Sequence, residues 1–258
     1  MSGPAPKKSL GQHFLTDDNI LGVIARLAEL DPGDVALEIG PGLGALTRVL
    51  ADRCAHVHAV ELDRRLEPHL RDIASRPNVS LHWGDALRLD LARLEPAPTK
   101  LVANLPYNVA TPIVAESLAG LPTVDLWCVM VQREVADRFF AVPSTKAYGA
   151  VSVLIRLAAV RTGFHPVSRT VFKPQPNVDS ALVAFRRIAL PDDFAGIRRV
   201  VEAAFAHRRK TLANSLQLAG VTTREEAVAA LTALGHDPSV RAEALDPRVF
   251  VELTRKLA

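Results

Sequence analysis

The sequence predicts an α/β protein with a doubly wound, largely parallel sheet and a small C-terminal helical domain. Short apolar segments rich in β-formers alternate with segments of helical periodicity as far as Phe140. A glycine-rich turn, Gly40–Gly44, joins the first buried strand to the helix after it. After Pro191 the chain becomes rich in alanine and keeps only helical spacing. Alternating strands and helices are typical of a parallel sheet covered on both faces, and the tail predicts a separate helical domain.

The individual elements are predicted from periodicity and from their boundaries. Residues 17–30 show helical apolar spacing, with Asp17 or Asp18 as the cap. After a turn, Val35–Ile39 is predicted to be a buried strand, and a helix is expected over 45–52. Further strands are expected at 56–60, 79–83, 100–103 and 126–131, and further helices at 64–75 and 133–140.

The second half of the chain predicts the closing strands and the domain boundary. Two β-rich segments, Val151–Val160 and Ser180–Arg187, flank a proline-rich loop at His165–Pro176. We predict that they form antiparallel strands that close the sheet. The change in composition beside Pro191 predicts two domains, residues 1–190 and residues 191–258.

Composition argues against several classes of protein. Hydrophobic residues make up 48% of the chain, so a large core is expected rather than disorder. Residues 1–6 are small and polar, and no apolar run approaches the roughly 18 residues of a membrane-spanning helix. Cys54 and Cys128 are too few and too isolated for a disulfide framework or a zinc site. We therefore expect a cytoplasmic protein without a signal peptide, a membrane segment or a metal.

The positive charge is concentrated near the C-terminus. Residues 1–185 are neutral, and residues 186–258 carry the whole net charge of +3. The clusters Arg186-Arg187, Arg198-Arg199 and His207–Lys210 supply most of it. Basic clusters of this kind suggest a polyanionic partner, although each one taken alone is more often a solvated helix face.

Polar groups at successive strand ends predict a nucleoside site. The turn Gly40–Gly44 allows close approach of a ligand, but its G-x-G-x-G spacing fits the dinucleotide fingerprint poorly. Glu61 ends the second strand, 17 residues after Gly44, where a carboxylate can accept both hydroxyls of a ribose. Asp85 follows the third strand, within reach of an adenine amine. Without an evident pyrophosphate clamp, these groups favour S-adenosylmethionine as the cofactor.

The segment Asn104-Leu105-Pro106-Tyr107 stands at the end of the fourth strand, where open α/β sheets bind ligands. The lone pair of an adenine N6 amine is delocalised into the ring, so the amine is a poor nucleophile. The Asn104 side-chain oxygen and the Leu105 carbonyl can accept its two N–H groups and favour a pyramidal nitrogen. Tyr107 can stack on the base. Phe172, on a loop stiffened by prolines, could cover the other face of a flipped base, or it could be a core residue.

Taken together, these motifs resemble one family along essentially the whole chain. The chain closely resembles the bacterial small-subunit (16S) rRNA adenine N6,N6-dimethyltransferases. The resemblance implies a Rossmann-like class I methyltransferase fold, a monomer, and dimethylation of two adjacent adenines in a 3'-terminal hairpin loop of 16S rRNA within the pre-30S subunit. It also implies kasugamycin resistance when activity is lost. The matching segments are Lys8–Leu15, Leu37–Thr47, Val60–Asp63, Gly84–Ala86, Asn104–Tyr107, Phe172–Leu182 and His207–Leu212.

The resemblance also implies roles for individual residues. His13 stands where relatives often have Asn, and either side chain can form hydrogen bonds. The implied catalytic residues are Asn104, Leu105, Pro106, Tyr107 and Phe172. The implied cofactor-binding residues are His13, Leu15, Gly40, Gly42, Glu61, Asp85, Ala86 and Asn104, and the expected RNA-binding residues are Arg208, Arg209 and Lys210.

Three alternatives compete with this prediction. The 23S rRNA methyltransferases of macrolide resistance more typically carry Ile at the second position of the tetrapeptide, so Leu105 and the long Phe172 loop favour the small-subunit enzyme. A nicotinamide oxidoreductase would need G-x-G-x-x-G spacing and a proton-transfer group, neither of which is evident. A non-catalytic ribosome-assembly factor needs only the basic surface, and the intact Asn104 segment argues against pure binding.

Overall fold

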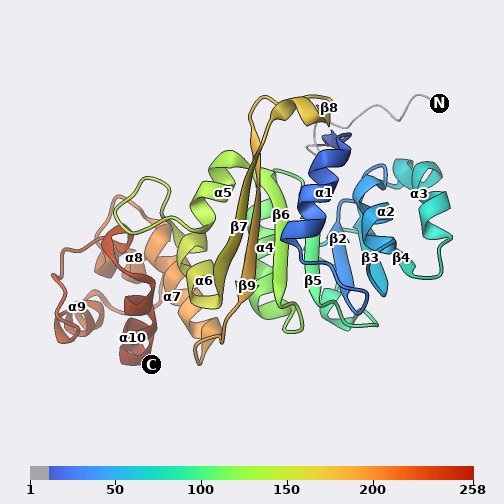
Figure 1. Cartoon of the computed structure of the whole chain (residues 1–258). Helices are drawn as coiled ribbons and strands as arrows, with labels where there is room; N and C mark the ends of the chain where they lie inside the picture. The colour runs from blue at the N-terminus through green and yellow to red at the C-terminus, as the bar shows by residue number, and fades with distance from the viewer. Residues whose placement is uncertain (1–11) are drawn as a thin grey trace. The chain divides into compact units, whose positions relative to one another are not determined.

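The computed structural model describes residues 12–258, which form two compact units (Figure 1). The first, here called the sheet unit, contains the described residues up to Ala136 together with Arg161–Arg187. The second, here called the helical unit, contains Asp137–Val160 together with Ile188–Ala258. The first eleven residues, including the start of the Lys8–Leu15 motif, lie outside the described part of the chain.

The main sheet has seven strands in the order β4-β3-β2-β5-β6-β9-β7. Neighbouring strands from β4 to β6 are parallel, and β9 is antiparallel to β6. From β2 the chain adds β3 and β4 on one side, and β5 and β6 then lie on the other side of β2. The boundary between β2 and β5 is therefore the topological switch point, where such sheets bind ligands. The strands are β2 (Val35–Ile39), β3 (His56–Glu61), β4 (Val79–Trp83), β5 (Lys100–Asn104), β6 (Leu126–Gln132), β7 (Ala159–Val167) and β9 (Ser180–Arg187).

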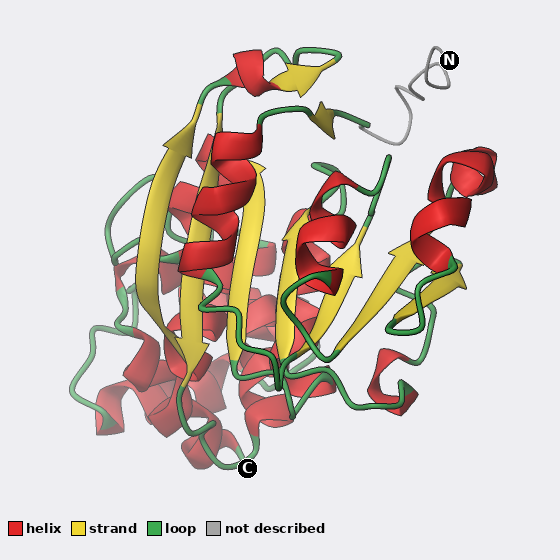
Figure 2. Ribbon diagram, turned by 45° about the vertical axis from the view of Figure 1, so that its right-hand side comes forward, coloured by secondary structure: helices red, strands yellow, loops and turns green. Residues whose placement is uncertain are grey.

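Helices cover both faces of this sheet (Figure 2). Helices α1, α2 and α3 lie on one face and bury Ile24, Leu50 and Leu70 against the strands. Asp17 caps α1, since its carboxylate accepts hydrogen bonds from the backbone N–H groups of Asn19 and Ile20. The helices are α1 (Asp18–Leu27), α2 (Ala45–Ala51), α3 (Glu67–Ala74), α4 (Ala110–Gly120) and α5 (Arg133–Phe139). The predicted α/β class and the strands through β6 are confirmed.

A two-stranded sheet that the sequence analysis did not predict joins the start of the described chain to the proline-rich loop. In this small sheet, β1 (Phe14–Leu15) pairs antiparallel with β8 (Phe172–Lys173). The pairing places Leu15 opposite Phe172, although the two residues are far apart in sequence. It fixes the N-terminal segment beside the sheet unit's ligand-binding edge.

The prediction of a strand over Val151–Val160 is wrong. Residues Ala150–Ala158 form helix α6, and strand β7 begins only at Ala159. A short apolar run is compatible with a buried helix as well as with a strand. The β-branched residues of this run therefore do not distinguish a strand from a helix. Tertiary contacts decide the outcome, because α6 packs against two helices of the tail, α7 (Phe194–Ala206) and α10 (Pro247–Leu257). The second predicted strand, Ser180–Arg187, is confirmed as β9.

The residues of the helical unit differ from those of the predicted C-terminal domain, which was expected to begin at residue 191. It takes in Asp137–Val160 as well as the tail, because α6 belongs to its core. Tyr148, Phe205 and Phe250 pack ring against ring there. Within residues 12–258, every helix is too short or too polar to span a bilayer. Besides α6, the helices of this unit are α7 (Phe194–Ala206), α8 (Leu212–Leu218), α9 (Arg224–Ala233) and α10 (Pro247–Leu257).

Candidate active site

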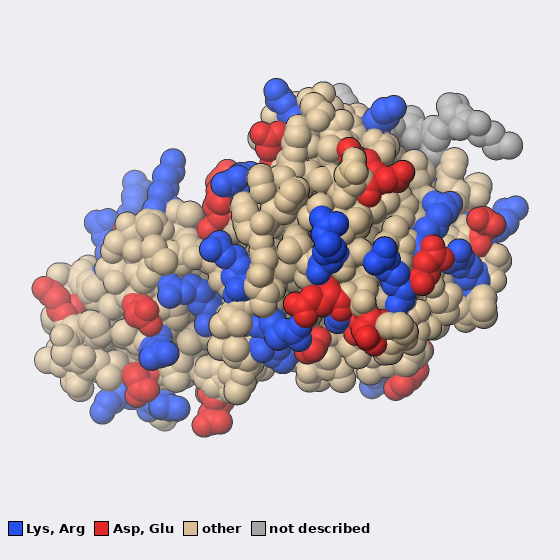
Figure 3. Space-filling view, in the orientation of Figure 1, with Lys and Arg blue, Asp and Glu red and all other residues tan. Residues whose placement is uncertain are grey.

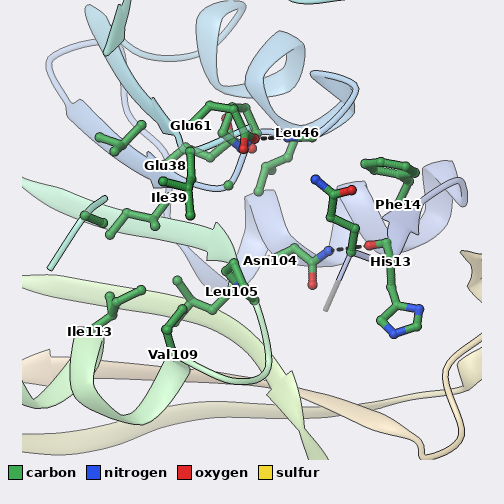
Figure 4. A pocket seen from close by; sticks show the side chains of 18 of the residues that line it. His13, Phe14, Glu38, Ile39, Leu46, Glu61, Asn104, Leu105, Val109 and Ile113 are labelled. Atoms are coloured by element: carbon green, nitrogen blue, oxygen red, sulfur yellow. Dashed lines mark hydrogen bonds between the residues drawn. The ribbon is translucent and has the colours of Figure 1, made fainter. Parts of the chain in front are cut away.

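A pocket of about 320 Å³ opens at the carboxyl ends of β2, β3, β4 and β5 in the sheet unit (Figure 4). All eight predicted cofactor residues and all four residues of the Asn104 segment line it, whereas Phe172 does not. The sequence analysis missed several other lining residues, most of them apolar. These include Gln12, Phe14, Glu38, Ile39, Leu43, Leu46, Leu62, Val109 and Ile113.

The glycine turn forms one wall of the pocket. Gly40, Gly42 and Gly44 all have positive φ angles, of 78°, 58° and 77°. A Cβ atom at Gly42 would also lie 2.9 Å from the ring of Phe14. Glycine is therefore required at Gly42 both by the backbone conformation and by the close packing of the N-terminal segment on the turn.

Glu61 is a buried carboxylate on the same wall, with 5% of its surface exposed. One carboxylate oxygen accepts the N–H of Asp63 at 2.8 Å, and the other accepts the N–H of Gly42 at 3.3 Å. Burial raises the pKa of Glu61, and these backbone hydrogen bonds oppose the rise. A carboxylate oxygen has about two acceptor sites, so each oxygen keeps capacity for a ligand hydroxyl. The two bonds hold the group in one orientation before any ligand arrives.

Asp63 acts as the support for this carboxylate. Its own side chain accepts hydrogen bonds from the guanidinium of Arg65, at 2.5 to 3.2 Å, and from the amide of Gln12 at 3.0 Å. The hydrogen bonds from Arg65 hold the pKa of Asp63 well below its usual range. Asp63 is therefore committed to protein partners, and Glu61 is the carboxylate available to a ligand.

Asp85 and Ala86, which follow β4, also line the pocket. One oxygen of Asp85 accepts the N–H of Leu87 at 3.0 Å, and Arg88 lies 3.6 Å from the other oxygen. The Asp85 side chain is 40% exposed, so its carboxylate faces both the pocket and water. It can accept a hydrogen bond from a ligand amine.

Glu38 is a polar residue of the pocket to which the sequence analysis gave no role. It is the next-to-last residue of β2 and only 1% exposed, and its Oε2 atom is buried without a hydrogen-bond partner among the described residues. Burial, with a smaller contribution from the nearby charge of Glu61, raises the pKa of Glu38 to about 8. The group is therefore largely protonated at neutral pH and can donate a hydrogen bond. An acidic residue two positions before the first glycine of the turn is the signal that could have identified it.

Asn104 ends β5 and points into the pocket (Figure 4). Its side-chain nitrogen Nδ2 donates a hydrogen bond to the backbone carbonyl of His13 at 3.1 Å. Because a carbonyl can only accept, this contact fixes which end of the amide turns toward His13. Leu105 is anchored by its N–H, which donates to the Met130 carbonyl at 3.1 Å. Both residues are held by backbone partners on other segments.

Tyr107 presents a ring that is held from two sides. Its hydroxyl lies 2.6 Å from Ser180 Oγ, and its ring stacks on the imidazole of His13 with centroids 5.4 Å apart and planes 29° from parallel. The Nδ1 atom of His13 in turn donates to the carbonyl of Pro174 at 2.7 Å. Burial raises the pKa of the Tyr107 phenol, so the ring stays neutral. Tyr107 is thus available for stacking rather than for proton transfer.

The expected role of Phe172 in stacking is not supported by its position. Its side chain is only 2% exposed and belongs to the hydrophobic core with Leu15, Val167 and Leu182. Pairing of β1 with β8 turns the ring inward, which the loop sequence did not reveal. The aromatic ring that faces Tyr107 comes from His13 instead.

The basic clusters differ in whether their side chains are bound to other groups of the protein. Arg187 donates to the carbonyls of Leu118, Leu121 and Val124, and Arg186 pairs with acidic side chains, so neither is a free surface cation. Arg208, Arg209 and Lys210 are exposed on the helical unit, between α7 and α8.

Comparison with known proteins agrees with this geometry. A family model described as ribosomal RNA adenine dimethylase matches residues 5–244. The chain is 48% identical over 257 residues to the ribosomal RNA small subunit methyltransferase A of Rubrobacter xylanophilus, with 99% of this chain and 96% of the relative covered. The solved structure of the 23S rRNA methyltransferase ErmE is 30% identical with a TM-score of 0.66, covering 95% of this chain and 99% of that one.

A dimethyladenosine transferase from Plasmodium falciparum, at 23% identity, has the same fold, with a TM-score of 0.77 over 93% of this chain and 96% of that one. The seven-stranded sheet is the class I methyltransferase fold that the resemblance implied. The site has the acceptors for a nucleoside and an amide at the strand end. The chain belongs to the ribosomal RNA adenine dimethylase family.

Proposed function

We propose that this protein uses S-adenosylmethionine to dimethylate N6 of two adjacent adenines in the 3'-terminal hairpin loop of 16S rRNA, in a pre-30S subunit in the cytoplasm. The observation that carries the proposal is the orientation of Asn104, whose amide nitrogen is bound to His13 and whose oxygen is left as an acceptor in the pocket. The name of the relative from Rubrobacter xylanophilus supports the small-subunit substrate. We further propose that the protein acts as a monomer.

The residues of the pocket fit the proposed cofactor. Both oxygens of Glu61 keep acceptor capacity for the ribose hydroxyls, and Asp85 can accept the adenine amine. The positive-φ glycines Gly40 and Gly42 let the backbone approach the ligand, and Leu15 and Ala86 add apolar contact. When bound, S-adenosylmethionine supplies an electrophilic methyl group.

The remaining groups act on the target base. The Asn104 oxygen and the Leu105 carbonyl would accept the two N–H groups of the amine, which favours a pyramidal nitrogen with a localised lone pair. No strong base is required, since the methylated ammonium that forms is very acidic. The contribution of the protein is orientation by groups that are fixed in advance, here by the bonds from Asn104 to His13 and from Leu105 to Met130.

Tyr107 would stack on the flipped base, and His13 would regulate access to it. The two rings are in contact, so a base that stacks on this face of Tyr107 must displace the His13 imidazole. The stacking of the base on Tyr107 would replace the stacking of His13 on Tyr107. The free-energy cost of displacing the His13 ring is therefore partly offset. This assignment takes the place of the stacking role expected for Phe172.

The second candidate is methylation of 23S rRNA, which the similarity to ErmE supports. The Leu105 position and the higher identity to a small-subunit enzyme favour the first candidate. Both would use the same pocket, so only the RNA substrate separates them.

The decisive experiment offers both substrates to the purified protein. Small and large ribosomal subunits that lack the modification would be incubated with S-adenosylmethionine, and nuclease fragments of each rRNA would be weighed by mass spectrometry. We expect four methyl groups on one 3'-terminal fragment of 16S rRNA and none on 23S rRNA. Methylation of 23S rRNA alone would establish the second candidate, and methylation of neither would refute the proposed activity.

A further inference from the structure

Tyr107 is held by two contacts of different kinds. Its ring stacks on the imidazole of His13, with the ring centroids 5.4 Å apart, and its hydroxyl lies 2.6 Å from Ser180 Oγ. Under the proposed function a target base takes the face of the ring that His13 covers, so the first contact is lost when the substrate binds. The second contact is made at the edge of the ring, where a stacked base does not compete for it. Ser180 is therefore the partner that keeps Tyr107 in place while the base is bound.

The hydroxyl of Ser180 serves this contact. Ser180 is the first residue of β9 and is 1% exposed. Within residues 12–258, the hydroxyls of Ser180 and Tyr107 form their side-chain hydrogen bond with each other and with no other group. Burying a hydroxyl is costly unless it is hydrogen-bonded, and an apolar side chain of similar size would otherwise suit this core position better. The serine is thus explained by Tyr107 rather than by packing.

Strand β6 supports both the stacking ring and the acceptors of the amine. Its last residue, Gln132, is the register partner of Ser180. Two positions earlier, Met130 is the register partner of Asn104, and its carbonyl accepts the N–H of Leu105 at 3.1 Å. The support of the ring and the support of the acceptors are therefore attached to one strand, two residues apart. The hydrogen bond from Ser180 thus fixes the ring relative to the acceptors.

We propose that Ser180 is a positioning residue for methyl transfer, whose hydroxyl holds the Tyr107 ring in the orientation that brings the amine of a stacked adenine to its two acceptors. The proposal rests on the proposed function, because it needs a base on Tyr107. A base stacked on a ring that can tilt is less often aligned with the acceptors, and alignment of the reacting groups is a large part of such catalysis. Ser180 contributes to this alignment without touching the substrate.

The first test is single-turnover methylation of unmethylated small ribosomal subunits, with S-adenosylmethionine and subunits both saturating. Ser180→Ala should lower the rate about three- to tenfold, the range expected for one hydrogen bond, and should leave the affinity for S-adenosylmethionine unchanged. The matched control is Ser117→Ala. Ser117 is also a buried serine of the sheet unit whose hydroxyl accepts a hydrogen bond from an aromatic side chain, Trp127 Nε1 at 2.8 Å, but it lies outside the active-site pocket. A normal rate in Ser180→Ala, or an equal loss in the control, would overturn the proposal.

Both substitutions exchange one neutral side chain for another. The Lys and Arg side chains that are spread over the surface (Figure 3) are the same in the wild type and the variants. Attraction to RNA phosphates, and with it the salt dependence of subunit binding, should therefore be unchanged. A reduced salt slope in Ser180→Ala would instead show that the variant loses phosphate contacts, which contradicts a role in alignment.

The route through Tyr107 is tested by a double-mutant cycle. Tyr107→Phe keeps the ring and removes the hydroxyl, so it breaks the same hydrogen bond as Ser180→Ala. The two single variants and the double variant should therefore have the same rate, because the bond can be lost only once. A double variant slower than either single variant would show that Ser180 acts by another route and would refute the positioning role.

A spectroscopic signal reports on the hydrogen bond directly. The chain contains two tyrosines, Tyr107 and Tyr148, so protein labelled with ¹³C-tyrosine gives two Cζ signals in an NMR spectrum. Tyr107→Phe removes one signal and thereby assigns both. Ser180→Ala should shift the Tyr107 signal and leave that of Tyr148, and Ser117→Ala should shift neither. An unmoved Tyr107 signal in Ser180→Ala would show that the two hydroxyls are not bonded in solution, which also refutes the proposal.

Failure of this inference is distinguishable from failure of the proposed function. If the wild type methylates small subunits and Ser180→Ala does so at the same rate, only the positioning role is wrong. If the wild type binds S-adenosylmethionine but methylates no ribosomal subunit, the proposed function itself is wrong.

Discussion

The side-chain nitrogen of Asn104 donates a hydrogen bond to the backbone carbonyl of His13 at 3.1 Å. This contact joins the N-terminal segment to the end of β5, and it decides which atom of the amide is left for a substrate. Because the nitrogen is engaged, the oxygen is free to accept a hydrogen bond, which is what activation of an adenine amine requires. The backbone of one segment thus orients the side chain of another.

Replacing Asn104 should separate binding from chemistry. Asn104→Ala should bind S-adenosylmethionine within about 0.5–1.5 kcal/mol of the wild type, the usual net value of one hydrogen bond. Its methyl-transfer rate should collapse, because the lost acceptor contributes most as charge develops on the amine. Single-turnover kinetics with saturating cofactor measures this. Asn108→Ala, which removes an exposed amide of the same pocket, is the control, and a normal rate in Asn104→Ala would refute the mechanism.

Glu61 should determine cofactor affinity. Glu61→Ala removes a carboxylate whose hydrogen bonds to two ribose hydroxyls would each contribute about 1.5–3 kcal/mol, so calorimetric binding of S-adenosylmethionine should be lost. The fold should persist, as judged by circular dichroism. Glu67→Ala, at an exposed position of the same unit, should bind normally. Affinity close to that of the wild type in Glu61→Ala would remove this residue from the site.

Glu38 should make the stability of the protein depend on pH. The native pKa is raised from 4.5 to about 8, so between these values the folded state binds a proton that the unfolded state has released. Stability must therefore fall as pH rises through this window, by at most about 5 kcal/mol at roughly 1.4 kcal/mol per pH unit. Glu38→Gln, which resembles the protonated acid, should flatten this dependence and be more stable than the wild type at pH 8.

Urea unfolding at pH 5, 6.5 and 8 measures the effect of Glu38. The exposed residue Glu67 supplies the control variant Glu67→Gln, which should follow the wild-type pH profile. The same decline with pH in Glu38→Gln as in the wild type would show that Glu38 is not protonated in the folded protein.

Phe172 should behave as a core residue. Phe172→Ala removes a buried ring, so it should lower the free energy of unfolding by about 3–5 kcal/mol. Val178→Ala, in the same loop but 45% exposed, should change it little. If Phe172→Ala were as stable as the wild type and impaired only the RNA-dependent step, the original stacking assignment would be restored.

The sequence by itself determined the α/β class, the strands of the main sheet as far as β6, and the cofactor and Asn104-segment residues of the pocket. The strands ending at Ile39, Glu61 and Asn104 follow from local apolar patterns, and parallel strands necessarily bring their carboxyl ends to one edge. The glycine turn, Glu61 at the end of β3 and Asp85 after β4 could therefore be placed in one site without coordinates. Helix caps, turns and strand ends depend on residues that are neighbours in the sequence, so local patterns predict them.

Only the tertiary structure decided the features that depend on contacts between distant segments. The apolar run at 150–158 became a helix because α7 and α10 cover it, and Phe172 turned inward because β8 pairs with β1. The raised pKa of Glu38 comes from complete burial, which no local pattern reveals. The Asn104 amide is oriented by a carbonyl 91 positions away, and the Tyr107 hydroxyl is hydrogen-bonded to a serine 73 positions away. Burial and hydrogen bonding across the fold are properties of the packed chain, so they emerge only when its segments come together.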